Sequence, residues 1–377
     1  MVQDAVALLP GFLGFGHFGG FYYFADRVAS SLRGALEART GRPFPVIPLS
    51  TLPTTGLAGR QEYLLQSLAR VEATLGGVER FHLVGHSVGG VDAHLLTLQS
   101  TFDRPLLDAA GVRKKIRSVV TIGSPHLGTG LANTEFAQFL RKPLAHIGGF
   151  PAVGRAIVDA LRGAPAEKEL PSTIAGALQD WRESLTFLKQ IVQHQELLDD
   201  LRPVRMSSLR ARSLPDPEVS ARVTCFVTAT RVPRGGDASD ALYRDLYGLT
   251  AKGAEDLGGA AREAQSVLEG ASSELVVKSS AAEVPASFEG AINDGLVNAC
   301  CQLAHPDRKG ELGALVIADH ADALGHYPRI DLFGAEDGAP DTKKIINPGL
   351  FHSGAGFRDD QFFGLYGRIA ARILEAT

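Results

Sequence analysis

A serine between glycines follows an apolar run in the first quarter of the chain. The segment reads Phe81-His82-Leu83-Val84-Gly85-His86-Ser87-Val88-Gly89-Gly90 and continues into Val91-Asp92-Ala93-His94-Leu95-Leu96. This pattern is typical of a buried strand, a very tight turn and a helix start, and the glycines prevent clashes across the turn. The helix N-terminus would face any negative charge that develops nearby. The segment predicts a nucleophile elbow at Ser87.

A serine nucleophile needs a histidine to take its proton and a carboxylate to orient that histidine. At an elbow of this kind the order along the chain is serine, acid, histidine. The best acid candidate is Asp294 in Asn293-Asp294-Gly295-Leu296-Val297, where an Asp-Gly pair after a strand would place the carboxylate on a tight turn.

Three histidines are candidates for the general base. His320 comes directly after the apolar run Leu315-Val316-Ile317-Ala318, His326 shares its loop, and His352 lies on a glycine-rich loop before the last helix. We expect His320 to be the base because it follows the last core strand. His352 and His326 are the alternatives.

The segment after the first strand is rich in glycine and aromatic residues. It runs Pro10-Gly11-Phe12-Leu13-Gly14-Phe15-Gly16-His17-Phe18-Gly19-Gly20. One interpretation is a flexible turn with a few core rings. The functional interpretation is that the N–H groups of Phe12 and Val88 form an oxyanion hole. We then expect the wall of the acyl pocket to include Leu13, Phe15, His17 and His86.

Strand-like and helix-like segments alternate along the chain, which predicts an α/β protein with a mostly parallel sheet and helices on both faces. Expected strands cover residues 4–9, 43–49, 81–85, 116–123, 222–229 and 315–318, and expected helices cover 24–39, 57–75 and 360–374. Residues 328–333 are a candidate for an edge strand.

We expect one domain over residues 1–377 with two insertions. Residues 131–220 hold a long helical pattern, favoured as a cap or lid over the nucleophile, with extra packing at the sheet edge as the alternative. Residues 231–290 are helical in composition and could be a second cap piece or a mobile flank.

Three segments together resemble the bacterial true lipases of the α/β-hydrolase fold. They are Pro10-Gly11-Phe12-Leu13-Gly14-Phe15, Gly85-His86-Ser87-Val88-Gly89-Gly90 and Thr121-Ile122-Gly123-Ser124-Pro125-His126-Leu127-Gly128-Thr129. The resemblance covers residues 1–130 well and the region from about 290 onward in pieces. One departure is Pro10-Gly11 where that family often has His-Gly.

The resemblance implies an oxyanion donor in the first segment and the nucleophile in the second. The family carries its triad acid in a similar Asn-Asp-Gly segment and its histidine in Asp-His-Leu-Glu or Asn-His-Leu-Asp, which supports Asp294 and His320. It often holds a structural calcium near that histidine. Asp322 fits one ligand position, but His326 and Tyr327 fall where further oxygen ligands would be needed. No other cofactor is expected.

Composition limits the partners. The 377 residues carry a net charge of −4 and 45% hydrophobic residues, so a large core is possible and a nucleic-acid partner is not indicated. No apolar run reaches transmembrane length. No signal peptide is visible, so the chain is expected to be intracellular, or secreted with a signal removed beforehand. Reduced thiols are expected at Cys225, Cys300 and Cys301, with a pairing of Cys225 to one of the others as the alternative.

These features predict a serine carboxylic-ester hydrolase of the lipase or esterase type that acts on small-molecule or lipid esters, with a transient contact to a lipid interface as an open possibility. One rival is an acyltransferase or aliphatic polyester depolymerase that uses the same triad. Another is a non-catalytic binding protein of the same fold.

Overall fold

The computed structural model describes residues 2–12, 14, 17–18, 21–99, 102, 108, 110–134, 196–231, 238–280, 282–325, 329–330, 345–347 and 355–377. Within these ranges the main sheet has seven strands in the order β4-β1-β5-β6-β7-β9-β8. Every neighbouring pair in it is parallel. The strands are β1 (Val2–Leu9), β4 (Val46–Pro48), β5 (Val78–His86), β6 (Ile116–Ile122), β7 (Arg222–Ala229), β8 (Val276–Val277) and β9 (Leu312–Ile317).

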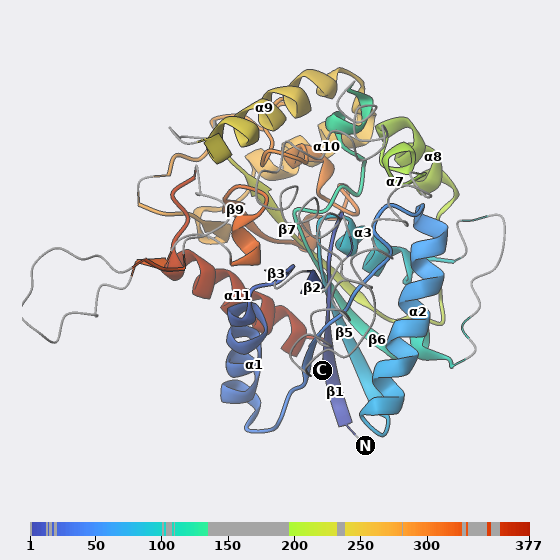
Figure 1. Ribbon diagram of the computed structural model, residues 1–377. Helices are drawn as coiled ribbons and strands as arrows, with labels where there is room; N and C mark the ends of the chain where they lie inside the picture. Colours follow the sequence, from blue (N-terminus) through green and yellow to red (C-terminus); the bar gives the residue numbers. More distant parts are fainter. Residues whose placement is uncertain are drawn as a thin grey trace, which may run out of the picture.

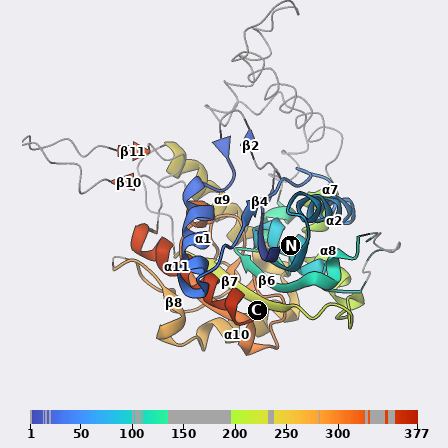
Figure 2. The ribbon, with the colours of Figure 1, turned by 90° about the horizontal axis from the view of Figure 1, so that it is seen from below.

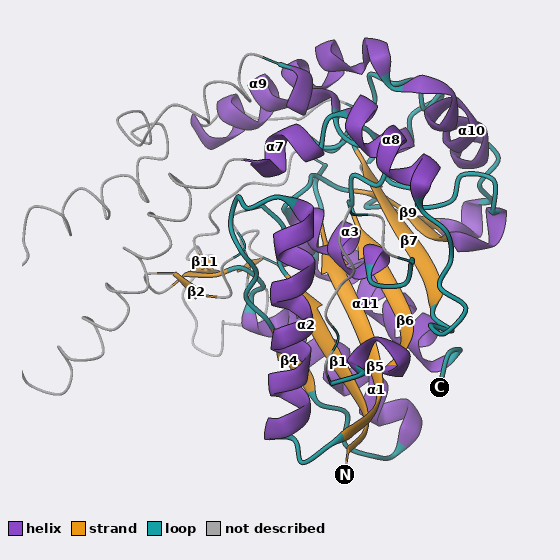
Figure 3. Cartoon of the chain, turned by 90° about the vertical axis from the view of Figure 1, so that its right-hand side faces the viewer, coloured by secondary structure: helices purple, strands orange, loops and turns teal. Residues whose placement is uncertain are grey.

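Helices cover both faces of the sheet (Figures 1 and 3). The α-helices are α1 (Asp26–Thr40), α2 (Leu57–Thr74), α3 (Val88–Leu95), α7 (Glu196–Asp200), α8 (Pro203–Arg212), α9 (Ala238–Lys252), α10 (Gly258–Glu269) and α11 (Asp359–Leu374). Short 3₁₀ helices are η1 (Val112–Lys115), η2 (Gly130–Asn133), η4 (Gly253–Asp256), η5 (Ser273–Leu275), η6 (Ala299–Cys301), η7 (Lys309–Glu311) and η8 (Asp322–Leu324).

Strand alternation divides the core between the two faces. Val6 and Leu8 of β1 pack with α1 and α11, whereas Ala5 and Ala7 pack with α2 and α3. Helix α10 packs against β7 and β9 through Ala264 and its neighbours. Strands buried on both faces need apolar residues at nearly every position, which explains their continuous apolar runs in the sequence. The predicted α/β class with a parallel sheet is confirmed.

The edge of the sheet differs from the prediction. Of the predicted edge strand at residues 328–333, only residues 329–330 are described, and they form β10 (Arg329–Ile330), which pairs antiparallel with β11 (Ile345–Asn347) in a separate two-stranded sheet (Figure 2). The main sheet ends instead at β8, which comes from the second insertion. A further small pair joins β2 (His17–Phe18) to β3 (Phe21–Tyr22).

The two predicted insertions lie toward the carboxyl ends of the strands as far as they are described. Figure 1 shows α7, α8 and α9 near those ends, whereas α10 packs against β7 and β9. Residues 135–195, the larger part of the expected lid, lie outside the described residues, so the lid stays a prediction. The second insertion contains α9, α10 and the edge strand β8.

The three cysteines are free thiols and all are buried. Burial raises the pKa of Cys225 to about 12. In the part of the chain that the structure describes, no helix combines the length and apolar character needed to span a membrane.

A fully buried ion pair joins α2 to α3, the helix that follows Ser87. Arg60 lies 2.6 Å from Asp92, and both side chains are completely inaccessible to solvent. Arg60 also donates to Thr51 Oγ1 at 3.0 Å and to the carbonyl of Leu52. Gln61 Nε2 donates to the Asp92 carbonyl at 3.0 Å. Such a pair contributes orientation more than net stability, because both ions lose their hydration.

Replacing Arg60 alone should therefore be costly. Arg60→Met leaves Asp92 buried without its cation, and we expect the free energy of unfolding to fall by about 3–5 kcal/mol in urea denaturation. The double variant Arg60→Met/Asp92→Leu removes both charges and should recover most of that loss. A double variant no more stable than Arg60→Met would contradict this account.

Three histidines from separate segments pack together, and one of them, His94, belongs to α3. The ring of His94 lies 5.1 Å from that of His126 and 5.0 Å from that of His305, centroid to centroid. Glu311 Oε1 lies 2.8 Å from Nδ1 of His305. Burial lowers the pKa of His94 well below its usual value, and nearby Arg210 and Arg308, together with the other two histidines, lower it further. Burial, reinforced by His305 and Arg210, lowers the pKa of His126 to about 3.

This cluster should make the protein acid-sensitive. Because the folded-state pKa of His126 is below the unfolded value of 6.5, the unfolded chain binds more protons below that pH. Stability should then fall as pH drops from about 6.5 toward about 3, by up to about 1.4 kcal/mol per pH unit for this one group. In His126→Gln the free energy of unfolding, measured by urea denaturation, should decline less steeply between about pH 7 and about pH 4.5 than in the parent. An unchanged slope would mean that His126 titrates normally.

Candidate active site

Ser87 occupies a strained turn between β5 and α3. Its backbone angles are φ 55° and ψ −130°, and among the described residues it is the one non-glycine residue with positive φ. Its N–H donates to the carbonyl of Ile122 on β6 at 2.8 Å. The predicted strand, tight turn and helix are present in that order. The serine is thus held at the carboxyl edge of the sheet.

Two glycines around Ser87 are required by close backbone contacts. A Cβ at Gly85 would lie 2.3 Å from the carbonyl oxygen of Gly89, and a Cβ at Gly89 would lie 2.3 Å from that of Leu9. Real Cβ atoms do not approach a backbone oxygen so closely, so side chains at these positions would force the turn open. The glycine spacing read from the sequence therefore has a steric cause.

Asp294 is completely buried in a turn beside the end of β7. Its Oδ1 accepts from the N–H groups of Leu296 and Val297 at 3.1 and 2.8 Å. Its Oδ2 accepts from the Thr228 hydroxyl and, at 3.3 Å, from Gln302 Nε2. These donors fix the carboxylate in one orientation.

The sequence prediction placed the turn of Asp294 directly after a strand, but no strand of the main sheet leads directly into it among the described residues. The nearest preceding strand is β8, which ends at Val277. The turn is held by a bridge between Thr230, just beyond β7, and Asn293. Thr228 and Gln302 were not predicted. Thr228 sits in an apolar strand pattern, and Gln302 carries no sequence signal of its contact with the acid.

His320 and Asp294 are joined twice. Nδ1 of His320 lies 2.8 Å from Oδ2 of Asp294, and the His320 N–H donates to the Asp294 carbonyl at 2.8 Å. Since an ionised carboxylate can only accept, Nδ1 of His320 carries a proton and donates it to Asp294. His320 is 4% exposed and follows β9, as predicted.

The end of β6 brings the serine turn and the acid–histidine pair to one place. Ile122 binds the Ser87 N–H, and the next residue is Gly123. A Cβ at Gly123 would lie 3.2 Å from Asp294 Oδ2 and 3.3 Å from His320 Nδ1. Gly123 also has φ 59°, so both its conformation and its surroundings require glycine.

The first glycine-rich loop lies directly against the serine. A Cβ at Gly11 would be 2.5 Å from Ser87 Cβ. Phe12 packs into the cluster that contains Val88, the first residue of α3. Thr51 N–H donates to the Gly14 carbonyl at 2.6 Å and so fixes the far end of the loop. Leu13 and Phe15 lie outside the described residues, and His17 is described only as part of β2.

The His86 ring lies between two hydrogen-bond partners. Its side chain is buried, with 1% exposure. Tyr23 Oη lies 2.8 Å from Nδ1, and the His320 carbonyl oxygen lies 2.8 Å from Nε2. Both ring nitrogens are hydrogen-bonded to protein groups, and the predicted substrate contact of His86 stays a prediction.

The remaining predicted site residues are the alternative bases and the possible calcium ligand Asp322. His326 and His352, the alternative bases, lie outside the described residues. Asp322 is buried, and its Oδ2 accepts the Asp319 N–H at 2.8 Å. Among the described residues, no group of three or more histidine, cysteine or acidic side chains is arranged to hold a metal ion. Residues 326–328, where further calcium ligands would be needed, lie outside the described residues, so the calcium site stays a prediction.

A second serine–histidine–aspartate set lies inside the sheet. His82 is 3.1 Å from Asp4 and 2.8 Å from Ser118 Oγ, on three adjacent strands. Although burial by itself raises the pKa of Asp4, hydrogen bonds from His82, Arg80 and Arg42 hold it well below its usual value. Ser118 is 2% exposed and extended, so no substrate can reach it.

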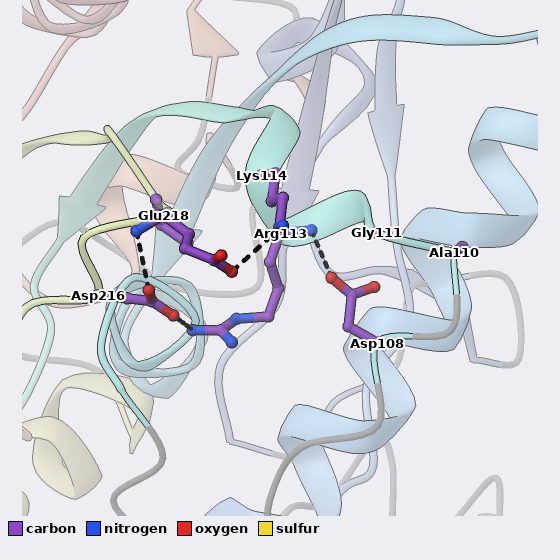
Figure 4. A pocket seen from close by; sticks show the side chains of 8 residues that line it. Asp108, Ala110, Gly111, Arg113, Lys114, Asp216 and Glu218 are labelled. Atoms are coloured by element: carbon purple, nitrogen blue, oxygen red, sulfur yellow. Dashed lines mark hydrogen bonds and ion pairs between the residues drawn. The ribbon is translucent and has the colours of Figure 1, made fainter.

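A surface hollow lies at the opposite end of β6, beside η1 (Figure 4). Its charged side chains pair with one another: Arg113 lies 2.7 Å from Asp216, and Lys114 lies 3.2 Å from Glu218. The hollow is lined by Asp108, Ala110, Gly111, Arg113, Lys114, Asp216, Glu218 and Val219. Its lining contains no serine, threonine, cysteine or histidine, and it lies at the amino ends of the strands, away from Ser87.

No protein-family model and no curated protein matches the chain. Solved structures that resemble it include lipase 1 from Pelosinus fermentans, at 16% identity, 100% coverage of each chain and a TM-score of 0.49. The Staphylococcus hyicus lipase has 16% identity over 99% of this chain and 96% of that chain, with a TM-score of 0.45. EstA from Clostridium botulinum has 16% identity over 86% of this chain and 83% of that chain, with a TM-score of 0.46.

A single fold supports many functions, so residue roles must come from the geometry of the site itself. The parallel sheet carries a serine turn after the interior strand β5, an acid beside the end of β7 and a histidine after β9. In this arrangement the chain has the α/β-hydrolase fold.

Proposed function

We propose that the protein is a serine carboxylic-ester hydrolase of the lipase or esterase type, with Ser87 as nucleophile, His320 as general base and Asp294 as orienting acid. One observation carries the proposal: the end of β6 brings a serine in a positive-φ turn and a buried, hydrogen-bonded aspartate–histidine pair to the same edge of the sheet. Such a pair converts a weakly nucleophilic hydroxyl into a reactive one.

The reaction proceeds in two halves. Ser87 Oγ attacks the ester carbonyl carbon while His320 Nε2 takes its proton, and the imidazolium is stabilised by Asp294. The carbon–oxygen bond to the alcohol then breaks, and His320 returns the proton to the departing alcohol. Water attacks the acyl-enzyme with His320 again as base, which releases the acid and restores Ser87.

The tetrahedral intermediates need donors for their oxyanion. Val88 is the first residue of α3, so its N–H has no acceptor within the helix, and the helix dipole favours negative charge there. We assign the second donor to the N–H of Phe12, next to Gly11, which contacts the serine. Removing one donor of this kind costs about 10²–10³ in kcat.

Ser87→Ala tests the nucleophile. We expect p-nitrophenyl ester hydrolysis, measured from acetate to palmitate, to fall by several orders of magnitude because no acyl-enzyme can form. The melting temperature should stay close to that of the parent, since the side chain lies at a turn and not in the core. A phosphonate should label the parent once, at Ser87. Labelling at another serine, or near-normal turnover by the variant, would exclude Ser87.

The same assay with an added alcohol shows whether water or an alcohol is the preferred acceptor of the acyl group. A hydrolase releases free acid as the main product, whereas an acyltransferase forms the new ester. Release of soluble acids from an aliphatic polyester film would indicate the depolymerase.

The choice of base is tested by comparing two histidines. His320→Ala should resemble Ser87→Ala, because only the catalysis of the oxyanion hole and substrate binding remains. His352→Ala should lose at most about tenfold, mostly through KM. Circular dichroism would check that both variants fold. The reverse ranking would transfer the base role to His352.

A further inference from the structure

A buried hydrogen-bonded chain connects the first glycine-rich loop to the backbone of His320. It begins where Gly11 lies against the Tyr23 hydroxyl: a Cβ at Gly11 would be 2.6 Å from Tyr23 Oη. Tyr23 Oη lies 2.8 Å from His86 Nδ1, and His86 Nε2 lies 2.8 Å from the His320 carbonyl oxygen. Tyr23 is 8% exposed and His86 is 1% exposed.

The direction of each bond follows from which groups can only accept. A carbonyl oxygen cannot donate, so the proton of His86 is on Nε2. Burial, together with the nearby charge of His320, lowers the pKa of His86 well below its usual value, which keeps the ring neutral. The lone pair on Nδ1 then accepts from the Tyr23 hydroxyl. Burial raises the pKa of Tyr23 well above its usual value, so this hydroxyl keeps its proton.

The two ends of the chain are the two parts of the site that must be held at a fixed separation. Gly11 contacts Ser87 and precedes the proposed oxyanion donor Phe12. The His320 backbone also donates to the Asp294 carbonyl at 2.8 Å. The rings of His86 and His320 lie 4.6 Å apart, centroid to centroid, so a neutral His86 avoids like-charge repulsion when His320 becomes protonated.

We propose that His86 and Tyr23 are positioning residues that fix the oxyanion loop relative to the loop of the base. The inference rests on the proposed function. His86 acts through the His320 backbone and not on substrate. Displacement of a reacting group by about 1 Å can cost about 10²-fold in rate, so loss of the chain should appear in kcat.

Two substitutions of His86 test its two hydrogen bonds, to Tyr23 and to the His320 carbonyl, one at a time. The amide nitrogen of Gln falls near the position of Nε2, so His86→Gln can still donate to the His320 carbonyl. The shorter Asn places its amide near Nδ1, so His86→Asn can serve Tyr23 but cannot reach His320. We expect His86→Asn to lower kcat by about 10- to 100-fold with KM changed by less than about threefold, and His86→Gln to recover most of the loss.

Tyr23→Phe removes the middle of the chain. We expect it to lower kcat by about 3- to 10-fold, and the double variant Tyr23→Phe/His86→Asn to be no slower than His86→Asn alone, because both act through one chain. Strictly additive losses would mean that the two side chains act independently and would overturn the proposal.

His82→Asn is the matched control. His82 is equally buried on the same strand, but its partners are Asp4 and Ser118. We expect this variant to lose stability and to retain kcat per active site, counted by phosphonate titration. An equal loss of kcat in His82→Asn and His86→Asn, or a His86→Asn kcat within twofold of the parent, would overturn the proposal.

Hydrogen exchange provides a readout independent of ester hydrolysis. The amides of residues 11–14 and 318–320 should exchange faster in His86→Asn and should be unchanged in His82→Asn, even if the parent hydrolyses no ester tested. Unchanged exchange in an active parent series would refute the positioning chain while leaving the hydrolase proposal intact.

Discussion

The left-handed backbone of Ser87 is the constraint on which the arrangement of the site depends. A non-glycine residue in such a conformation costs about 1–3 kcal/mol and persists only when its surroundings hold it. Here the bond from its N–H to Ile122 and the close approach of Gly85, Gly89 and Leu9 hold it. The same approach sets how near β1 and β6 come to the turn, and these two strands lead into the first glycine-rich loop and Gly123.

The two serine–histidine–aspartate sets show why residue types alone do not define a catalytic site. His82, Asp4 and Ser118 have distances close to those expected of a triad, yet they lie on extended strands within the sheet. Asp294 and His320 lie on turns at the carboxyl edge, next to a helix N-terminus. Only the second set lies next to the first turn of a helix, where backbone N–H groups have no acceptor within the helix.

The polar groups of the site are arranged before any substrate arrives. Asp294 accepts from two backbone N–H groups and three side chains, and its neighbour Gln302 is itself bonded to the backbone of Thr228. The hydrogen bonds of His86 have one possible direction: the Tyr23 hydroxyl donates to Nδ1, and Nε2 donates to the His320 carbonyl. Groups oriented in this way need little reorganisation when charge develops, and this is how a preorganised site lowers a barrier.

Most of the core strands and helices, and one site residue, Ser87, could be predicted from the sequence alone for a stated physical reason. Glycines around Ser87 and apolar runs for strands buried on both faces have local causes, so the elbow and the parallel sheet could be predicted. Asp294 and His320 could be chosen by chain order and flanking pattern. Their mutual contact depends on residues far apart in sequence, as do the roles of Thr228, Gln302, Tyr23 and His86. Only the tertiary structure could decide those contacts, including the bonds of His86 to Tyr23 and to the His320 carbonyl, because a ring nitrogen's partner is set by packing and not by its place in the chain.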